Sequence, residues 1–178
     1  MAWLAAAQAL GIAIVELSVG RAEAAERRIR EAREFFVAIG NLWYISIVDE
    51  FLCATVGAQD RPHEFLRLAD AFAATVLVTD RENLIKRHLV LARTHLLRGS
   101  PVDAEIAARC GLELAEQTDL VVDHADALLM LADALDALDR RDDAAMARGE
   151  ALTKLRAKGN LAAVARLTRL GGQRSPSS

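Results

Sequence analysis

Two segments, Ile39-Gly40-Asn41-Leu42 and Lys158-Gly159-Asn160-Leu161, are nearly the same four residues and lie 119 positions apart. The glycine in each suits the end of a helix, because glycine adopts the left-handed conformation found there at little cost. Residues that interrupt helices recur about every 40 positions, at Gly20, Asp60, Gly99 and Asp139. A second interruption follows each of these by about 20 positions, at Gly40, Asp80, Asp119 and Gly159. The spacing predicts four repeats, each made of two helices joined by a turn.

The segments between these interruptions have the pattern of amphipathic helices. Apolar residues such as Ala25, Ile29 and Ala32 recur every three or four positions, which places them on one helix face. Ser100 followed by Pro101 predicts a helix start, with serine as the N-cap and proline in the first turn. The predicted helices span residues 2–18, 22–38, 42–57, 62–78, 83–97, 101–117, 122–138 and 142–157, with a short ninth at 161–170.

Each two-helix unit has an apolar face that a neighbouring unit must cover, so the repeats are expected to stack into an array. Small residues recur where two helices would approach closely, namely at Ala25, Ala32, Ala104, Gly111, Ala144 and Ala151, whereas the second repeat has Phe65 and Phe72 there. We predict an all-α domain over residues 1–170. Its expected parts are repeats at about 1–40, 41–80, 81–119 and 120–159, a capping helix at 161–170, and a disordered tail at 171–178.

The composition supports this fold class and excludes several others. Of the 178 residues, 35 are alanine, and only 4% are aromatic, which favours helices over a β-sheet core. The two cysteines form neither a zinc nor a redox motif, and a net charge of −3 lacks the basic excess of a nucleic-acid-binding domain. The apolar segment at residues 2–15 is too short to cross a membrane, so we expect a cytoplasmic protein.

At several positions the chain resembles a tetratricopeptide-type repeat protein. In the fourth repeat, Leu131-Ala132, Leu135, Ala144 and Ala151 match that family's hydrophobic–small, large, small and small positions, although its closing proline is absent. The period of about 40 is similar to the variant repeats of bacterial transcription regulators. The stretch from Ala125 to Ala163 resembles the C-terminal repeats of actinobacterial regulators that join a signal-transduction ATPase to a class III adenylate cyclase or LuxR-type output. The resemblance implies a right-handed superhelical array, an α-solenoid, with a regulatory role.

The resemblance also implies a binding surface, because the first helix of each repeat in that family lines a concave groove. Transferred to this chain, the groove positions are Glu50, Lys86, Arg93, Asp126, Asp133 and Asp136. Residues seven apart, such as Lys86 and Arg93, share a helix face. We therefore expect a non-catalytic scaffold that binds a protein or peptide partner along a groove that changes from basic to acidic.

No motif of an enzyme or of a cofactor site is present. There is no P-loop, and His88 and His95 are two helical turns apart, too far to share a metal ion. We interpret Asp123-His124-Ala125-Asp126 as the solvent-exposed start of a helix. We therefore predict no catalytic, cofactor-binding or metal-binding residues, and no cofactor. An alternative function is a sensor that encloses a small apolar effector, in which case Trp43, Tyr44 and Phe72 would line the pocket.

The first helix lacks the polar outer face that normally closes a repeat array. Residues 2–15 carry no charge, and Leu4 and Ile12 are candidates for an apolar packing face. This pattern predicts a neighbour for that face. Preceding repeats or an ATPase domain of a longer chain would provide one, and a second copy in a homodimer is the other possibility.

Overall fold

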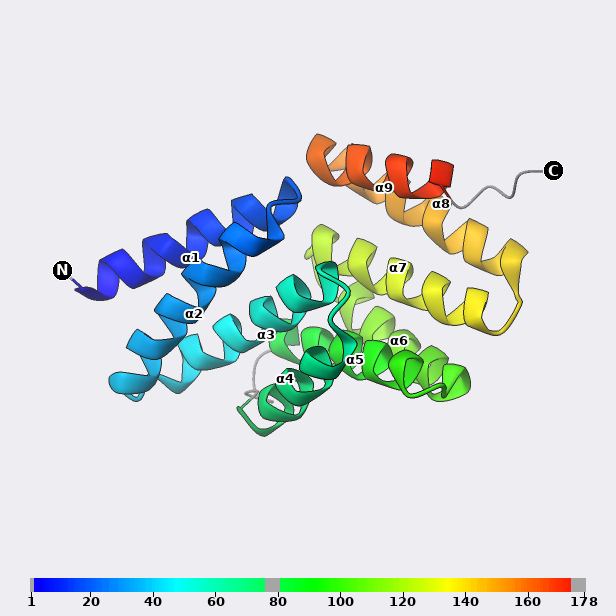
Figure 1. Cartoon of the computed structure of the whole chain (residues 1–178). Coiled ribbons are helices and arrows are strands. Elements are labelled where there is room, and N and C mark those ends of the chain that lie inside the picture. Colours follow the sequence, from blue (N-terminus) through cyan, green and yellow to red (C-terminus); the bar gives the residue numbers. More distant parts are fainter. Residues whose placement is uncertain (1, 76–80, 174–178) are drawn as a thin grey trace.

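The computed structural model describes residues 2–75 and 81–173, with only the backbone for Arg166 and for residues 169–173. Over these residues the chain is entirely helical, apart from turns, as predicted (Figure 1). The helices are α1 (Ala2–Ser18), α2 (Ala22–Ala38), α3 (Leu42–Ala58), α4 (Pro62–Thr75), α5 (Arg81–Leu97), α6 (Pro101–Glu116), α7 (Val121–Ala137), α8 (Arg141–Ala157) and α9 (Leu161–Gln173). Asp80, one of the predicted interruptions, lies outside the described residues.

The helix ends fall where the periodic interruptions predicted them. Positive φ angles occur at Gly20, Gly40, Asp60, Gly99, Asp139 and Gly159. After each of these, the next backbone N–H donates to a carbonyl five residues earlier, for example Asn41 to Phe36 and Asn160 to Leu155, both at 3.0 Å. These bonds satisfy carbonyls that the helix end leaves without a partner. The recurrent residue therefore sets the same sharp turn six times.

Two local expectations need correction. Ser100 stands at the N-cap of α6, but its side chain makes no capping hydrogen bond. Asn41 and Asn160 do cap their helices, since each side-chain oxygen accepts a backbone N–H at 3.1 Å. The last helix also extends to Gln173 instead of ending at 170, because two glycines weaken a helix without stopping it. Residues 174–178 of the expected tail lie outside the described residues.

The hairpins stack with their first helices together. Helix α1 contacts α3, α3 contacts α5, and α5 contacts α7, whereas contacts between the second helices are at most marginal over the described residues. Figure 1 follows this stacking from α1 and α2 at one end to α8 and α9 at the other. Since the first helices lie closer together, they form the inner side of the array. The predicted groove helices are therefore on the inner side.

Small side chains occupy the contacts between helices, as the repeat pattern predicted. Ala25, Ala104 and Ala144 have no exposed surface, and Phe65 and Phe72 of the second repeat are also buried. The buried apolar residues form one cluster over α1–α4 and a second one from α5 to α8. Packing of alanine on alanine lets the helix backbones approach closely, so most of the core consists of short side chains.

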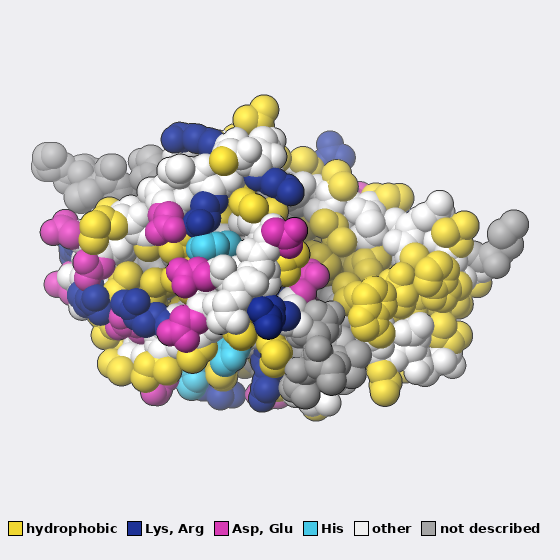
Figure 2. Space-filling view, turned by 180° about the vertical axis from the view of Figure 1, so that it is seen from behind, with side chains coloured by type: hydrophobic (Ala, Val, Ile, Leu, Met, Phe, Trp, Pro, Cys, Tyr) yellow, Lys and Arg dark blue, Asp and Glu magenta, His cyan; other side chains and the backbone are white. Residues whose placement is uncertain are grey.

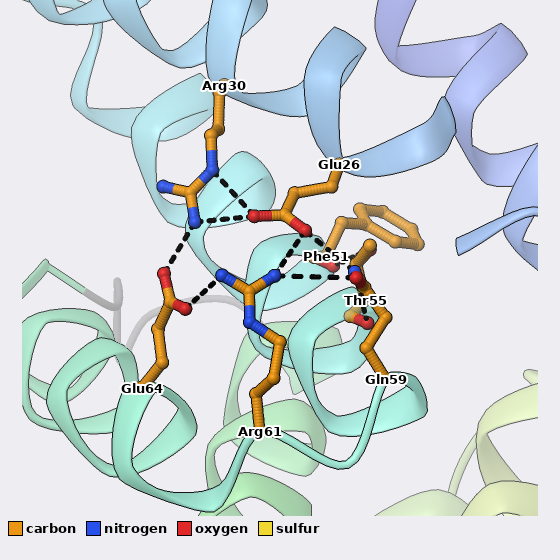
Figure 3. Close-up of polar contacts among 7 residues, drawn as sticks. All are labelled: Glu26, Arg30, Phe51, Thr55, Gln59, Arg61 and Glu64. Carbon is orange, nitrogen blue, oxygen red and sulfur yellow. Dashed lines mark hydrogen bonds and ion pairs between the residues drawn. The ribbon is translucent and has the colours of Figure 1, made fainter. Parts of the chain in front are cut away.

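A polar network joins the first two repeats (Figure 3). Glu26 of α2 is 9% exposed and accepts hydrogen bonds from Arg30 at 2.8 Å, Gln59 at 2.7 Å and Arg61 at 2.6 Å. Arg30 and Arg61 also both bind Glu64 of α4. Burial raises the pKa of Glu26, but the bonds from Gln59, Arg30 and Arg61 outweigh it and hold that pKa below its ordinary value. The network ties α2 to the turn and helix that follow α3.

Candidate groove on the inner side of the array

A cavity of about 410 Å³ lies between the first helices of the second, third and fourth repeats. Helices α5 and α7 each contribute four residues with spacings of three, one and three, which is one face of a helix. Equivalent residues of the two helices are 40 positions apart, so the wall repeats with the period of the sequence. The lining residues are Leu17, Glu50, Phe51, Cys53, Ala54, Gly57, Ala58, Phe65, Lys86, Leu89, Val90, Arg93, Asp126, Leu129, Met130 and Asp133.

Five of the six predicted groove residues line this cavity: Glu50, Lys86, Arg93, Asp126 and Asp133. Asp136, the sixth, is not part of the wall. It accepts a hydrogen bond from Arg148 of α8 at 2.6 Å, and Arg148 also donates to Asp133 at 3.0 Å. Arg148 was not predicted, because the resemblance implied groove positions only on the first helix of each repeat.

At one end of the cavity, three carboxylates surround a single lysine. We call Glu50, Lys86, Asp123 and Asp126 the Lys86 cluster. The ammonium of Lys86 lies 2.5 Å from the carboxylate of Asp123, and both side chains are largely buried. Burial would lower the pKa of Lys86, but the charges of Glu50, Asp126 and Asp123 raise it well above its ordinary value. Lys86 is therefore a permanent cation within an acidic surrounding.

Asp123 corrects the interpretation of the Asp123-His124-Ala125-Asp126 segment. The side chain of Asp123 is not at an exposed helix start, because the residue is only 5% exposed and binds Lys86. The spacing of three between Asp123 and Asp126 was a usable signal, since it places both on one face of α7. What the sequence could not show is that this face meets α5.

Glu50 has a different environment from the aspartates of the same cluster. Burial, and then the negative charges of Asp126, Asp123 and Glu82, raise its pKa, while Lys86 opposes them. No side chain among the described residues forms a hydrogen bond or an ion pair with its carboxylate, because Lys86 is bound to Asp123 instead. A carboxylate in this state gains free energy from any donor or cation that enters the cavity.

The charges do not form the simple gradient that the spacing suggested. Basic residues stand beside acidic ones at both ends of the cavity, with Lys86 next to Asp126 and Arg93 on the same wall as Asp133. Arg93 makes no ion pair with any carboxylate in the described part of the chain, unlike Lys86 and Arg148. Between the charged ends the wall is apolar, with Leu89, Leu129 and Met130 prominent.

The aromatic residues expected around an enclosed effector lie elsewhere. Phe72 is 1% exposed in the core of the first two repeats, and Trp43 is 48% exposed on the surface. Tyr44 stacks on Phe36 with ring centroids 4.3 Å apart and packs against Trp3 at 5.5 Å. None of the three expected residues lines the cavity.

The thiol on the cavity wall and two histidines of α5 and α7 have shifted pKa values. Burial, with Glu50 and Asp49 adding their negative charge, raises the pKa of the Cys53 thiol to about 12, so the nucleophilic thiolate is not formed at neutral pH. Burial also lowers the pKa of His88 and of His124. Over the described residues, no three His, Cys, Asp or Glu side chains are grouped as metal ligands would be.

A second surface stands out at the α1 end of the array. Helix α1 buries Ala6, Leu10 and Ala13 but exposes Leu4 (51%) and Ile12 (48%), the predicted packing face. Trp3, Val15 and Val19 of the same segment are exposed as well. Figure 2 shows hydrophobic side chains gathered at this end of the molecule, whereas charged side chains dominate the other end. The single charged residue of α1, Glu16, pairs with Arg28 of α2 at 3.1 Å.

No family model matches the sequence, and no curated protein matches it significantly. Within the described residues, every helix is too short or too polar to cross a membrane.

Proposed function

We propose that this chain is a helical-repeat scaffold of the tetratricopeptide type that binds a segment of a protein partner in the groove of α3, α5 and α7. The observation that supports this most is the composition of the cavity wall. Equivalent faces of three successive first helices meet there, with charged residues at both ends and apolar residues between them. Such a wall suits an amphipathic segment, in which apolar side chains provide burial and polar ones set the position.

The sequence resemblance extends this proposal to a regulatory role in the cytoplasm, as part of a signalling or transcription regulator. The groove is compatible with that role because regulators dock partner segments reversibly. A docking role does not require catalytic residues. The thiol of Cys53 on the cavity wall is a poor candidate for a catalytic nucleophile, because its pKa is raised.

Filling the groove tests the proposal. Ala54 is an exposed residue of the cavity wall, whereas Ala73 is exposed on α4 away from it. Peptides of about 15 residues would be selected from a displayed random library on the purified chain, and their dissociation constants measured by fluorescence anisotropy. Ala54→Trp should weaken binding by about tenfold or more, since the indole occupies the space that a docked segment needs.

The matched variant Ala73→Trp adds the same side chain outside the groove and should leave the affinity unchanged. Circular dichroism would confirm that both variants keep the wild-type helix content. Equal affinities for Ala54→Trp and Ala73→Trp, or the recovery of no binding peptide at all, would contradict the proposed function.

We also propose that the exposed face of α1 packs against a second copy of the chain. A two-fold interface places the same patch on both sides, so like charges would oppose each other if the patch carried any. This face carries none from Ala2 to Val15, and Leu4, Ile12 and Val15 are exposed on it. An uncharged apolar surface of this kind is complementary to itself.

A further inference from the structure

The Lys86 cluster has an excess of negative charge. Among the cluster's own side chains, Glu50, Asp123 and Asp126 are acidic, and Lys86 alone is basic. The ammonium of Lys86 is bound to Asp123 at 2.5 Å, so its charge is already engaged. The charges of Glu50, Asp126 and Asp123 raise the pKa of Lys86, and burial, with Asp126 and Asp123 adding their negative charge, raises the pKa of Glu50. A second positive charge would be stabilised at this place.

The position of Glu50 shows where that charge would lie. Its carboxylate is on the cavity wall and accepts no hydrogen bond from any side chain among the described residues. Phe51, Leu89 and Met130 contribute apolar surface to the same wall. A ligand group that fits both features has a cationic end and an aliphatic stem, which is the construction of a lysine or arginine side chain.

We infer that the Glu50 end of the groove is a pocket for one lysine or arginine side chain of the docked partner segment, with apolar residues of that segment on the adjoining wall. This inference rests on the proposed function and adds the chemistry of the partner. Glu50 receives the cationic group, and Lys86 holds Asp123 in place beside it. A metal ion is a poorer occupant, because the described residues group no set of ligands for it.

The test uses the peptides selected on the wild-type chain. Replacing the essential lysine or arginine of a peptide by norleucine keeps the apolar stem and removes the charge. On the wild-type chain this replacement should weaken binding by about tenfold, the size of one charge-assisted contact. On the Glu50→Gln variant the same replacement should change the affinity by less than about twofold, because the partner of the charge is gone.

Glu50→Gln is expected to fold, since it removes a carboxylate that burial and its neighbours disfavour. Glu31→Gln, on the exposed side of α2, is the matched control and should behave as wild type. If norleucine weakens binding equally on the wild-type chain and on Glu50→Gln, the inference is wrong. It is also wrong if the selected peptides contain no essential cation. If Ala54→Trp loses peptide binding while one of these two results is found, the inference about the cationic pocket is wrong but the proposed function is still supported.

A pH titration gives a second readout. The groups that face Glu50 are Cys53 on α3, Lys86 and Glu82 on α5, and Asp123 and Asp126 on α7. The raised pKa of Glu50 means that it gains a proton at a higher pH than an ordinary glutamate. Affinity for the cationic peptide should therefore fall as the pH is lowered, starting at a higher pH than the titration of an ordinary glutamate, and the fall should be less steep in Glu50→Gln. The last outcome concerns free n-butylamine as a competitor. If n-butylamine displaces the peptide at concentrations as low as the peptide's dissociation constant, the pocket binds a small molecule, and the inference that a partner side chain docks there is wrong.

Discussion

At the scale of single residues, the glycines inside helices divide by what surrounds them. A Cβ added to Gly111 of α6 would lie 3.2 Å from the Cδ2 of Leu89 and 3.3 Å from the Cβ of His88. A Cβ added to Gly149 of α8 would meet nothing within 4 Å. Gly111 therefore lets α6 approach α5, the helix that forms the middle of the groove wall, whereas Gly149 has no such role.

This difference predicts opposite effects of the same substitution. Gly149→Ala should raise the free energy of unfolding by about 1 kcal/mol, because alanine favours the helix. Gly111→Ala should lower it by about 1 kcal/mol, since the Cβ of His88 lies close to the backbone and cannot yield without moving α5. Urea denaturation followed by circular dichroism measures both. Equal stabilisation by the two alanines would show that the α5–α6 contact is not close-packed.

At the scale of elements, buried ion pairs fix how neighbouring helices are placed. Arg33 of α2 donates to the buried carboxylate of Asp49 on α3 at 2.5 Å, and the network around Glu26 reaches the start of α4 (Figure 3). Buried polar groups need partners, so these contacts favour one arrangement of the helices over others with similar apolar burial. The part of the groove wall that α3 provides depends on this arrangement.

Glu26→Gln should lower the free energy of unfolding at pH 7 by about 1–2 kcal/mol, because Arg30 and Arg61 lose a charged acceptor but stay partly in contact with water. The pKa of Glu26 is lowered in the folded state. The contribution of Glu26 to the free energy of unfolding is therefore fully present above the ordinary glutamate pKa, and it is lost as the pH falls through the lowered pKa. The variant should therefore lose less stability than wild type between about pH 5 and about pH 3.

Urea denaturation at a series of pH values measures this effect. Glu34→Gln, at an exposed position of the same helix, is the control and should retain the wild-type pH dependence. A Glu26→Gln curve parallel to that of the wild type would mean that the network does not contribute to acid stability.

At the scale of the whole molecule, the two ends of the array differ. Helix α9 covers α8 with Val164 and Leu167, which pack on the second core cluster. Helix α1 instead exposes Leu4, Ile12 and Val15 to solvent. A helix that is apolar on all sides is normally covered by protein, so the α1 end is where association between copies is expected.

We expect the wild-type chain to form dimers at about 100 μM and the double variant Leu4→Glu, Ile12→Glu to be monomeric. Two glutamates on the interface would face their symmetry equivalents without partners. The control is Val102→Glu with Ile106→Glu, which changes two equally exposed apolar residues of α6 and should remain dimeric. Sedimentation or light scattering gives the masses, and a monomeric wild-type chain would rule out this interface.

Much of the array could be predicted because its signals are local. The left-handed turns at Gly20, Asp60, Gly99 and Asp139 need only the residue itself and the helix before it. That Lys86 and Arg93 share a helix face is also a local property, since residues seven apart do so whatever the fold. That this face belongs to a groove was implied only by the family resemblance. Ion pairs between side chains of different helices could not be predicted from local sequence in this way. Arg148 with Asp136, and Arg61 with Glu26, join residues whose distance depends on how the helices stack.

The sequence by itself determined the helices, their ends and the period at which small side chains recur, because each of these depends on a residue and its neighbours within a turn or two. The tertiary structure alone decided that Asp123 is buried against Lys86, that Glu50 is left without a hydrogen-bond partner in the described groove wall, and that Trp43, Tyr44 and Phe72 lie outside it. The physical reason is that burial and pairing depend on the distance between helices, and that distance follows from the packing of the whole array.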